Sequence, residues 1–408
     1  MLCVKKRTLS KSCALLLLLL GTSVHLQASF FDDYMVDPND GMLDASQYLT
    51  DVPMGFLPVP TIITEPATGN GLGLMGIFFH ESDEQKKQRI GDDKQGKHFI
   101  LPHNISIVGL GATENGSKAA GLGHMGFWLD DTLRYKGFLL YPDFNLDFYS
   151  LGGNDLPNPI ELNVTGPMVI QNLKARLGKS HWFVGAHQIF REVSTSLTNQ
   201  PNFNLLPSDK INTQINNYIS NKTNDKTITS GLGLILEYDS RNNPMNPERG
   251  YDYQIEITRF DTAIGSDIDY DSYHFEGLNY WNLSKQFNLG LRLQFDEVST
   301  ADDQQLPSYI PPSIDLRGVP AIRYQGNQVA VGEVELTWKL DQRWRFNTFT
   351  GAGRAASNFD ELAKAKNIKN YGIGFRYLIA KRYGFVMGAD IAKGPEDSAI
   401  YIQAGSTW

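Results

Sequence analysis

The chain has 408 residues, a net charge of −8 and a pI near 5.5, and its two cysteines are Cys3 and Cys13. An acidic chain is not expected to bind nucleic acid, because phosphate binding needs clustered Lys and Arg side chains. With both cysteines so early, a disulfide scaffold, a zinc–cysteine cluster and a cysteine nucleophile are excluded for the rest of the chain.

The first residues have the pattern of a secretory signal peptide. Basic side chains come first, an apolar run extends from Ala14 to Leu20, and small or polar residues follow up to Ala28. We predict a signal peptide over residues 1–28, cleaved after Ala28. An uncleaved anchor is the alternative, and the short apolar run disfavours it because a helix needs about 20 apolar residues to span a bilayer.

A short periplasmic segment is predicted over residues 29–56, and strand-like stretches then follow one another over residues 57–408. No later apolar run is long enough for a membrane-spanning helix, and a chain that crosses a membrane without helices must close into a barrel. We therefore predict an all-β, transmembrane antiparallel β-barrel of about 16 strands. The predicted strands lie near 57–65, 70–81, 103–112, 117–128, 133–142, 160–177, 181–196, 229–240, 250–260, 271–282, 286–298, 324–339, 345–356, 368–378, 382–393 and 398–408.

A soluble β-sandwich is the alternative fold, since it shows the same period-two alternation with the apolar face as its core. The connections favour the barrel, because short turns on one rim alternate with long loops on the other. The turns fall near 241–250, 284–286, 341–343 and 380–382, and the loops over 197–228 and 299–323. The segment 82–102 is a long connection on the turn side, which is unusual for such a barrel.

Two glycine runs have the GxGxxG spacing: Gly71, Gly73 and Gly76, and then Gly121, Gly123 and Gly126. Each lies within a strand pattern, whereas dinucleotide binding needs a strand, a turn and a helix. We assign these glycines to the close packing of twisted strands, and no cofactor is expected. The histidines show no ligand spacing, so no metal site is predicted either.

The strands near 368–378 and 382–393 alternate most clearly. Small or polar residues are expected to face the lumen and bulky apolar ones the lipid. The lumen row consists of Gly372, Gly374 and Arg376, continued by Gly384, Gly388 and Asp390, and the lipid row of Tyr371, Ile373, Phe375 and Tyr377, continued by Tyr383, Phe385, Met387 and Ile391. The last strand is expected to run to the terminal aromatic, Trp408.

Four motifs in the second half of the chain are more specific. The run DSRNNPMNPERG ends one strand, turns at two prolines and restarts at a glycine; its marked positions are Asp239, Arg241, Pro247 and Gly250. The loop segment LRGVP contains Arg317 and Gly318, and GNQVAVGEVELTWKL and GIGFRY follow. In this order they resemble the barrel domain of the BamA/TamA-type outer-membrane assembly superfamily, also called the bacterial surface antigen family. The resemblance is strong over 232–408 and weak over the rest.

The resemblance implies that the loop with the Arg-Gly pair folds into the barrel, where its arginine meets acids of the following strands. The arginine would be Arg317 and the matching acid Glu335, which shares the lumen face with Glu333. The family also has an aspartate in a Phe-x-Asp-x-Gly pattern, where this chain has Gly351. A second partner is therefore expected from Glu333 or Asp390. A solvated loop arginine is the alternative.

The resemblance also implies an outer-membrane protein that helps to insert or translocate protein or lipid through a weakly paired seam between its first and last strands. Its partners would be outer-membrane lipid, nascent outer-membrane or secreted polypeptides, and the barrel-assembly machinery for its own insertion. The sequence leaves no room for POTRA repeats before the barrel, as in a short, barrel-only branch, and no enzymatic activity is expected. Two alternatives stay open. One is a surface antigen or narrow pore without a client, and the other is an outer-membrane hydrolase with a dyad such as His274 and Asp296.

Overall fold

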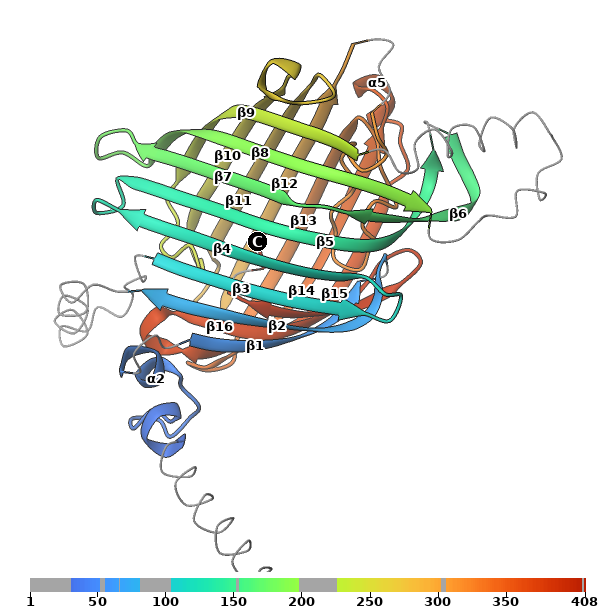
Figure 1. Ribbon diagram of the computed structural model, residues 1–408. Coiled ribbons are helices and arrows are strands. Elements are labelled where there is room, and N and C mark those ends of the chain that lie inside the picture. Colours follow the sequence, from blue (N-terminus) through green and yellow to red (C-terminus); the bar gives the residue numbers. More distant parts are fainter. Residues whose placement is uncertain are drawn as a thin grey trace, which may run out of the picture.

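The computed structural model describes residues 31–51, 56–65, 67–80, 104–151, 154–197, 226–301, 306–405 and 407–408. The predicted signal peptide, the segment 82–102 and most of the predicted loop 197–228 lie outside these residues. The described chain forms one 17-stranded antiparallel sheet that curls into a barrel (Figure 1). None of the helices in this part of the chain has the length and apolar character needed to cross a membrane.

The strands lie close to their predicted positions. They are β1 (Phe56–Glu65), β2 (Gly69–His80), β3 (Asn104–Thr113), β4 (Lys118–Trp128), β5 (Leu133–Leu151), β6 (Asn154–Thr165), β7 (Met168–Arg176), β8 (Trp182–Leu197), β9 (Lys226–Asp239), β10 (Gly250–Phe260), β11 (Tyr270–Asn282), β12 (Phe287–Ser299), β13 (Gln328–Lys339), β14 (Trp344–Ala356), β15 (Ile368–Ala380), β16 (Phe385–Lys393) and β17 (Ser398–Ala404). Short helices are α2 (Ser46–Asp51), η2 (Thr262–Ile264), α5 (Phe359–Leu362) and η3 (Lys381–Tyr383).

Consecutive strands pair antiparallel, with one interruption. Both β6 and β7 pair with β5 on one side and β8 on the other. They are therefore two halves of one wall strand, broken at Gly166 and Pro167, where proline has no N–H to give to the ladder. The 17 strands therefore occupy 16 positions in the barrel wall, which confirms the predicted strand number.

The barrel has two different rims. We call turn rim the end where short connections join β4 to β5, β7 to β8, β9 to β10, β11 to β12, β13 to β14 and β15 to β16. The opposite end is the loop rim, which carries the connection between β12 and β13. The long connection between β12 and β13 thus lies on the predicted rim, but β3 and β4, and β16 and β17, are also joined there by short turns.

The outer face is apolar. Leu72 on β2 is 71% exposed to the surroundings, while its neighbour Gly73 faces the lumen. Near the turn rim, aromatic rings contact one another in pairs around the outside: Trp128 with Tyr135, Trp182 with Tyr238, Tyr251 with Trp281, Trp338 with Phe346, and Trp344 with Tyr377. Such a girdle belongs where a barrel wall meets the membrane interface. The single curled sheet and its exposed apolar rows show that the β-sandwich alternative is wrong.

Two predictions about the last strands were wrong. The final strand ends at Ala404 and not at Trp408, because Gly405 takes a φ of +90° and the chain turns into the lumen. Tyr383 and Phe385 do not face lipid, since they are 2% and 1% exposed in an apolar cluster at the turn rim. The ladder between β15 and β16 shifts register after Leu378, and a bulge of this kind moves the following side chains off the period-two pattern.

Candidate functional site

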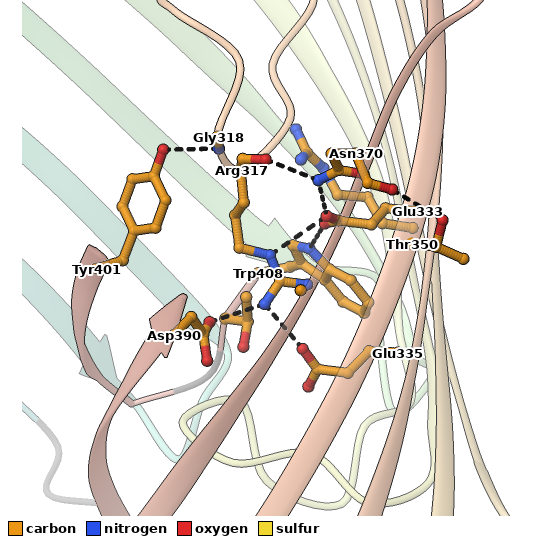
Figure 2. Close-up of polar contacts among 12 residues, drawn as sticks. Arg317, Gly318, Glu333, Glu335, Thr350, Asn370, Asp390, Tyr401 and Trp408 are labelled. Atoms are coloured by element: carbon orange, nitrogen blue, oxygen red, sulfur yellow. Dashed lines mark hydrogen bonds and ion pairs between the residues drawn. The ribbon is translucent and has the colours of Figure 1, made fainter. Parts of the chain in front are cut away.

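The loop between β12 and β13 folds into the barrel, and Figure 2 shows its residues Arg317 and Gly318 beside residues of the last strands. Its apolar residues Ile314, Leu316 and Val319 are buried against Val329 and Val331 of β13. This packing fixes the loop on the wall. Arg317, between two of these buried positions, then extends its side chain into the lumen.

The guanidinium group of Arg317 binds three carboxylates. Nε lies 3.2 Å from Glu333 Oε1, and Nη1 lies 2.9 Å from Glu335 Oε2 and 2.8 Å from Asp390 Oδ2. The guanidinium carbon also lies 3.3 Å from the centre of the Phe349 ring. Burial alone would lower the pKa of Arg317, but the surrounding carboxylates raise it, so the side chain stays charged. Charge-assisted bonds to buried partners, together with stacking, hold a loop more firmly than a surface pair does.

Other side chains complete this group, which we call the Arg317 cluster. Arg376 donates to both oxygens of Asp390 at 2.6 and 2.9 Å. Asn370 donates to Glu333 and to the main-chain oxygen of Arg317, both at 2.9 Å. In the same region (Figure 2), the indole of Trp408 donates to Glu333 at 2.9 Å, and the Tyr401 hydroxyl accepts from the N–H of Gly318 at 2.9 Å. The last strands and the loop are therefore joined through one polar network in the lumen.

The structure thus brings together most of the residues that the sequence singled out. Gly372 and Gly374 belong to this site because a Cβ there would lie 2.2 Å from the Phe349 ring and 1.8 Å from Asp390. Asn370 and Tyr401 were missed, since an isolated Asn or Tyr in a strand has no sequence signal of its role.

Gly351 stands where the resemblance led us to expect an acid, and Asp390 supplies the additional carboxylate from another strand. A Cβ at Gly351 would lie 2.8 Å from Leu316 Cδ2 and 2.8 Å from the main-chain oxygen of Gly332. The missing side chain therefore leaves room for the loop residue.

We expect Gly351→Ala to destabilise the barrel by about 1–3 kcal/mol, since it overpacks this contact. Gly332→Ala is the matched control on the neighbouring strand, because a Cβ there meets nothing closer than 3.6 Å. Urea unfolding of the two purified variants measures the difference. Equal stability of both variants would contradict the packing argument.

The turn motif lies at the turn rim, where Asp239 and Arg241 form an ion-pair group of their own, while Pro247 lines a small pocket beside Arg376 and Trp408 of the Arg317 cluster. Arg241 Nε lies 3.0 Å from Asp239 Oδ1, and its Nη2 lies 2.6 Å from Asp252 Oδ2. Pro247 lies within the same turn, and Gly250 begins β10. Asp239 and Asp252 come near enough to Glu237 to share a cation. Arg241 and Arg134 already bind the two aspartates, so we interpret this group as an ion-pair network.

The candidate dyad of the hydrolase alternative is formed. His274 on β11 lies opposite Asp296 on β12, with Nδ1 2.6 Å from Oδ1. Among the described residues, the hydrogen bonds of His274 include none to a hydroxyl or thiol that could act as nucleophile. A carboxylate and the imidazole that it orients are two members of a hydrolytic triad, whose third member is the nucleophile. The geometry gives no support to hydrolysis beyond this pair.

The first and last strands form a seam in the barrel wall. β1 and β17 lie side by side, but within the described residues no backbone ladder joins them. The hydroxyl of Thr64 instead donates to the main-chain oxygen of Ile400 at 2.8 Å and accepts from its N–H. At the loop rim, Glu65 also accepts from the N–H of Ala321 at 3.0 Å. Side-chain contacts therefore hold the seam where every other neighbour shares main-chain bonds.

Residues 31–51, which we call the N-terminal strap, cross the turn rim below this seam. Arg343 in the turn between β13 and β14 is 2% exposed and lies 2.7 Å from Asp37, 2.9 Å from Asp40 and 2.6 Å from Asp44. Ala45 donates its N–H to the main-chain oxygen of Ile379 at 2.7 Å. The strap therefore ties the segment before β1 to hairpins on the far side of β17.

We expect acid to release the strap. The hydrogen bond from Arg343 and the other contacts of Asp40 hold the pKa of its carboxyl below the ordinary value of 3.8. A carboxyl with a depressed folded-state pKa stabilises the fold above its unfolded pKa, and this stabilisation is lost as pH falls through the folded pKa. Pepsin cleavage of residues 31–51 should therefore begin only below about pH 4. Cleavage at an equal rate on both sides of that pH would contradict this.

These features define the class of the protein: a single-chain transmembrane β-barrel with an arginine-bearing loop folded into its lumen. Residues 182–310 match the Omp85 superfamily domain. A search of curated proteins found no match to the chain.

Solved structures share the fold at low sequence identity. BamA from Haemophilus ducreyi lacking POTRA domains 1–3 matches with a TM-score of 0.51 and 11% identity, over 86% of this chain and 69% of that one. CdiB from Escherichia coli matches with a TM-score of 0.52 and 10% identity, over 85% and 62%. CdiB from Acinetobacter baumannii gives 0.50 and 11%, over 86% and 59%. This chain therefore spans about three fifths of the CdiB chains.

Proposed function

We propose that this protein acts in the outer membrane, where it helps to insert or translocate polypeptide or lipid by opening the seam between β1 and β17. The observation that carries the proposal is the seam itself, in which a single threonine hydroxyl stands in for a ladder. An edge strand with free main-chain groups is a template for pairing with another chain. No catalytic step is part of this proposal.

The contents of the lumen favour this function over a narrow pore. The loop with Arg317 fills part of the lumen, and the strap residues Ala45 and Leu49 pack with Val59 and Phe385 at the turn rim. A conducting pore needs a continuous aqueous path, and the inward loop and the apolar cluster of the strap both take up space along such a path. The seam offers a route through the wall instead.

A disulfide across the seam tests the proposal. Thr64→Cys with Ile400→Cys places two thiols at the hydrogen-bonded pair, and the sequence has no other cysteine after Cys13. The matched control is Ile373→Cys with Ile391→Cys, two directly opposed positions on β15 and β16. Each pair replaces the gene in a deletion strain, and the outer-membrane proteins and lipids are quantified with and without reductant.

We expect the oxidised seam pair to reproduce the deletion phenotype, because β1 and β17 can no longer separate, and reductant to restore the wild-type inventory. The control pair should have the wild-type inventory under both conditions. A strain with a fully oxidised seam and an unchanged inventory would refute the proposed function.

A further inference from the structure

A cavity of about 820 Å³ lies inside the barrel, against the wall formed by β1 to β5 and β7. Its middle and deep parts are lined by apolar side chains: Ile63, Met75, Ile107, Phe138, Leu140 and Ile170. The lumen of a transmembrane barrel is usually polar. An apolar cavity of this size, within the range of pockets for small molecules, therefore points to a ligand.

Glycines from both GxGxxG runs open this cavity. Gly73, Gly121 and Gly123 face it from β2 and β4, and Gly109 and Gly111 face it from β3 between them. A Cβ at Gly123 would lie 2.7 Å from the Phe138 ring, and a Cβ at Gly111 would lie 3.0 Å from Ile63 Cδ1. Three adjacent strands thus present glycines, which have no side chain, to the cavity, and aliphatic and aromatic side chains surround this glycine patch. Close packing of the strands alone does not require the free volume that these glycines leave inside the barrel.

The cavity has one polar end. At the loop rim, its lining includes the polar residues Glu65, Thr68, Thr113 and Ser117. The deep end is formed by Met75, Ile107 and Phe138 and has no charged group in its lining. Ala321 of the inward loop also lines the cavity, next to its hydrogen bond with Glu65. A ligand that fits has one polar group at the loop rim and an apolar body below it.

We propose that this cavity binds the hydrocarbon chain of a single-chain amphiphile, with its polar head among the side chains at the loop rim. The inference rests on the proposed function, because β1 forms both a wall of the cavity and one side of the seam. It names lipid, rather than polypeptide, as the cargo that enters the lumen. Each methylene buried should strengthen binding by about fourfold until the chain fills the cavity.

Binding of cis-parinaric acid, a fatty acid that fluoresces in apolar surroundings, tests this. The full-length processed protein is held in a fluorinated surfactant, which offers no competing hydrocarbon tail. Ala119→Leu fills the cavity from β4, and Gly109→Leu fills it from β3, where a Cβ has 3.4 Å to its nearest neighbour. Val108→Leu is the matched control, because this neighbour of Gly109 is 45% exposed on the outer face and is not part of the cavity lining.

We expect saturable binding by the wild type and by Val108→Leu, and at least about tenfold weaker binding by both cavity variants. Variants that lose the heat-dependent gel shift of a folded barrel are excluded, and the two independent fillings guard against one of them misfolding. Absence of saturable binding by the wild type, or equal binding by all folded variants, would overturn the proposal.

Competition identifies the source of the chain. Displacement by a free fatty acid, by a lysophospholipid or by both supports the cavity as an acyl-chain site and shows which head it accepts; displacement by neither overturns it. The test is independent of the seam experiment. If the wild type does not bind the probe but the oxidised seam reproduces the deletion phenotype, the acyl-chain site is refuted and the proposed function stands. If the wild type binds the probe but the oxidised seam leaves the inventory unchanged, the proposed function is refuted and the acyl-chain site stands.

Discussion

Replacing Arg317 with alanine is expected to release the inward loop and to lower the free energy of unfolding by about 3–5 kcal/mol. The variant leaves Glu333, Glu335 and Asp390 in the lumen with Arg376 as the remaining guanidinium of the cluster. Glu333 and Asp390 are almost fully buried, so water cannot replace the lost partner. Urea unfolding of the purified barrel, followed by tryptophan fluorescence, measures the change.

Two further variants separate charge from geometry. Arg317→Lys keeps the charge but loses the planar fork and the stacking on Phe349, so its stability should lie between those of the wild type and the alanine variant. Arg259→Ala is the control, because this half-exposed arginine pairs with Asp261 and Asp271 at the surface, and little change is expected. Equal effects of Arg317→Ala and Arg259→Ala would show that the loop is not held by the cluster.

Arg317→Ala also distinguishes the proposed function from the pore alternative. In planar bilayers we expect wild-type protein to conduct weakly, since the loop and the apolar cluster at the turn rim occupy the lumen. Arg317→Ala should raise the conductance because the loop is freed. A large and stable wild-type conductance would favour a pore and count against the proposed function.

The sequence predicted the wall of the barrel well because each strand carries its own signal. Alternation with a period of two depends only on neighbours along the chain and on which side is apolar, so the strands from β9 to β15 could be placed within a few residues. The contact between Arg317 and Glu335 came instead from the resemblance to known barrels. No local sequence pattern indicates that a loop folds into the lumen of the barrel.

The predictions that were wrong, and the features that were missed, depend on contacts between distant parts of the chain. Trp408 has the pattern of a terminal membrane aromatic, yet Gly405 turns it inward to Glu333. The strap was expected to be only a short segment before the barrel, and three aspartates in such a segment look like a solvated surface. Their partner, Arg343, is about 300 residues away, with separations of 299 to 306 positions.

Arg343→Ala is expected to detach the strap and to destabilise the barrel by about 3 kcal/mol, because Asp37 and Asp44 are buried and would lose their cation. Hydrogen exchange should then rise over residues 31–51 and along β1. Lys381→Ala is the matched control. This residue also binds Asp37, at 3.2 Å, but its side chain is 36% exposed, so a loss below about 1 kcal/mol is expected.

The strap and Thr64 hold opposite ends of the same seam, so their effects should be coupled. If the strap keeps β1 beside β17, Thr64→Ala will cost less stability in the Arg343→Ala background than in the wild type, because the seam is already open there. A double-mutant cycle from urea unfolding gives the coupling energy. Strictly additive effects would mean that the strap closes the turn rim without acting on the seam, and that opening of the wall is controlled by the Arg317 cluster and Thr64 alone.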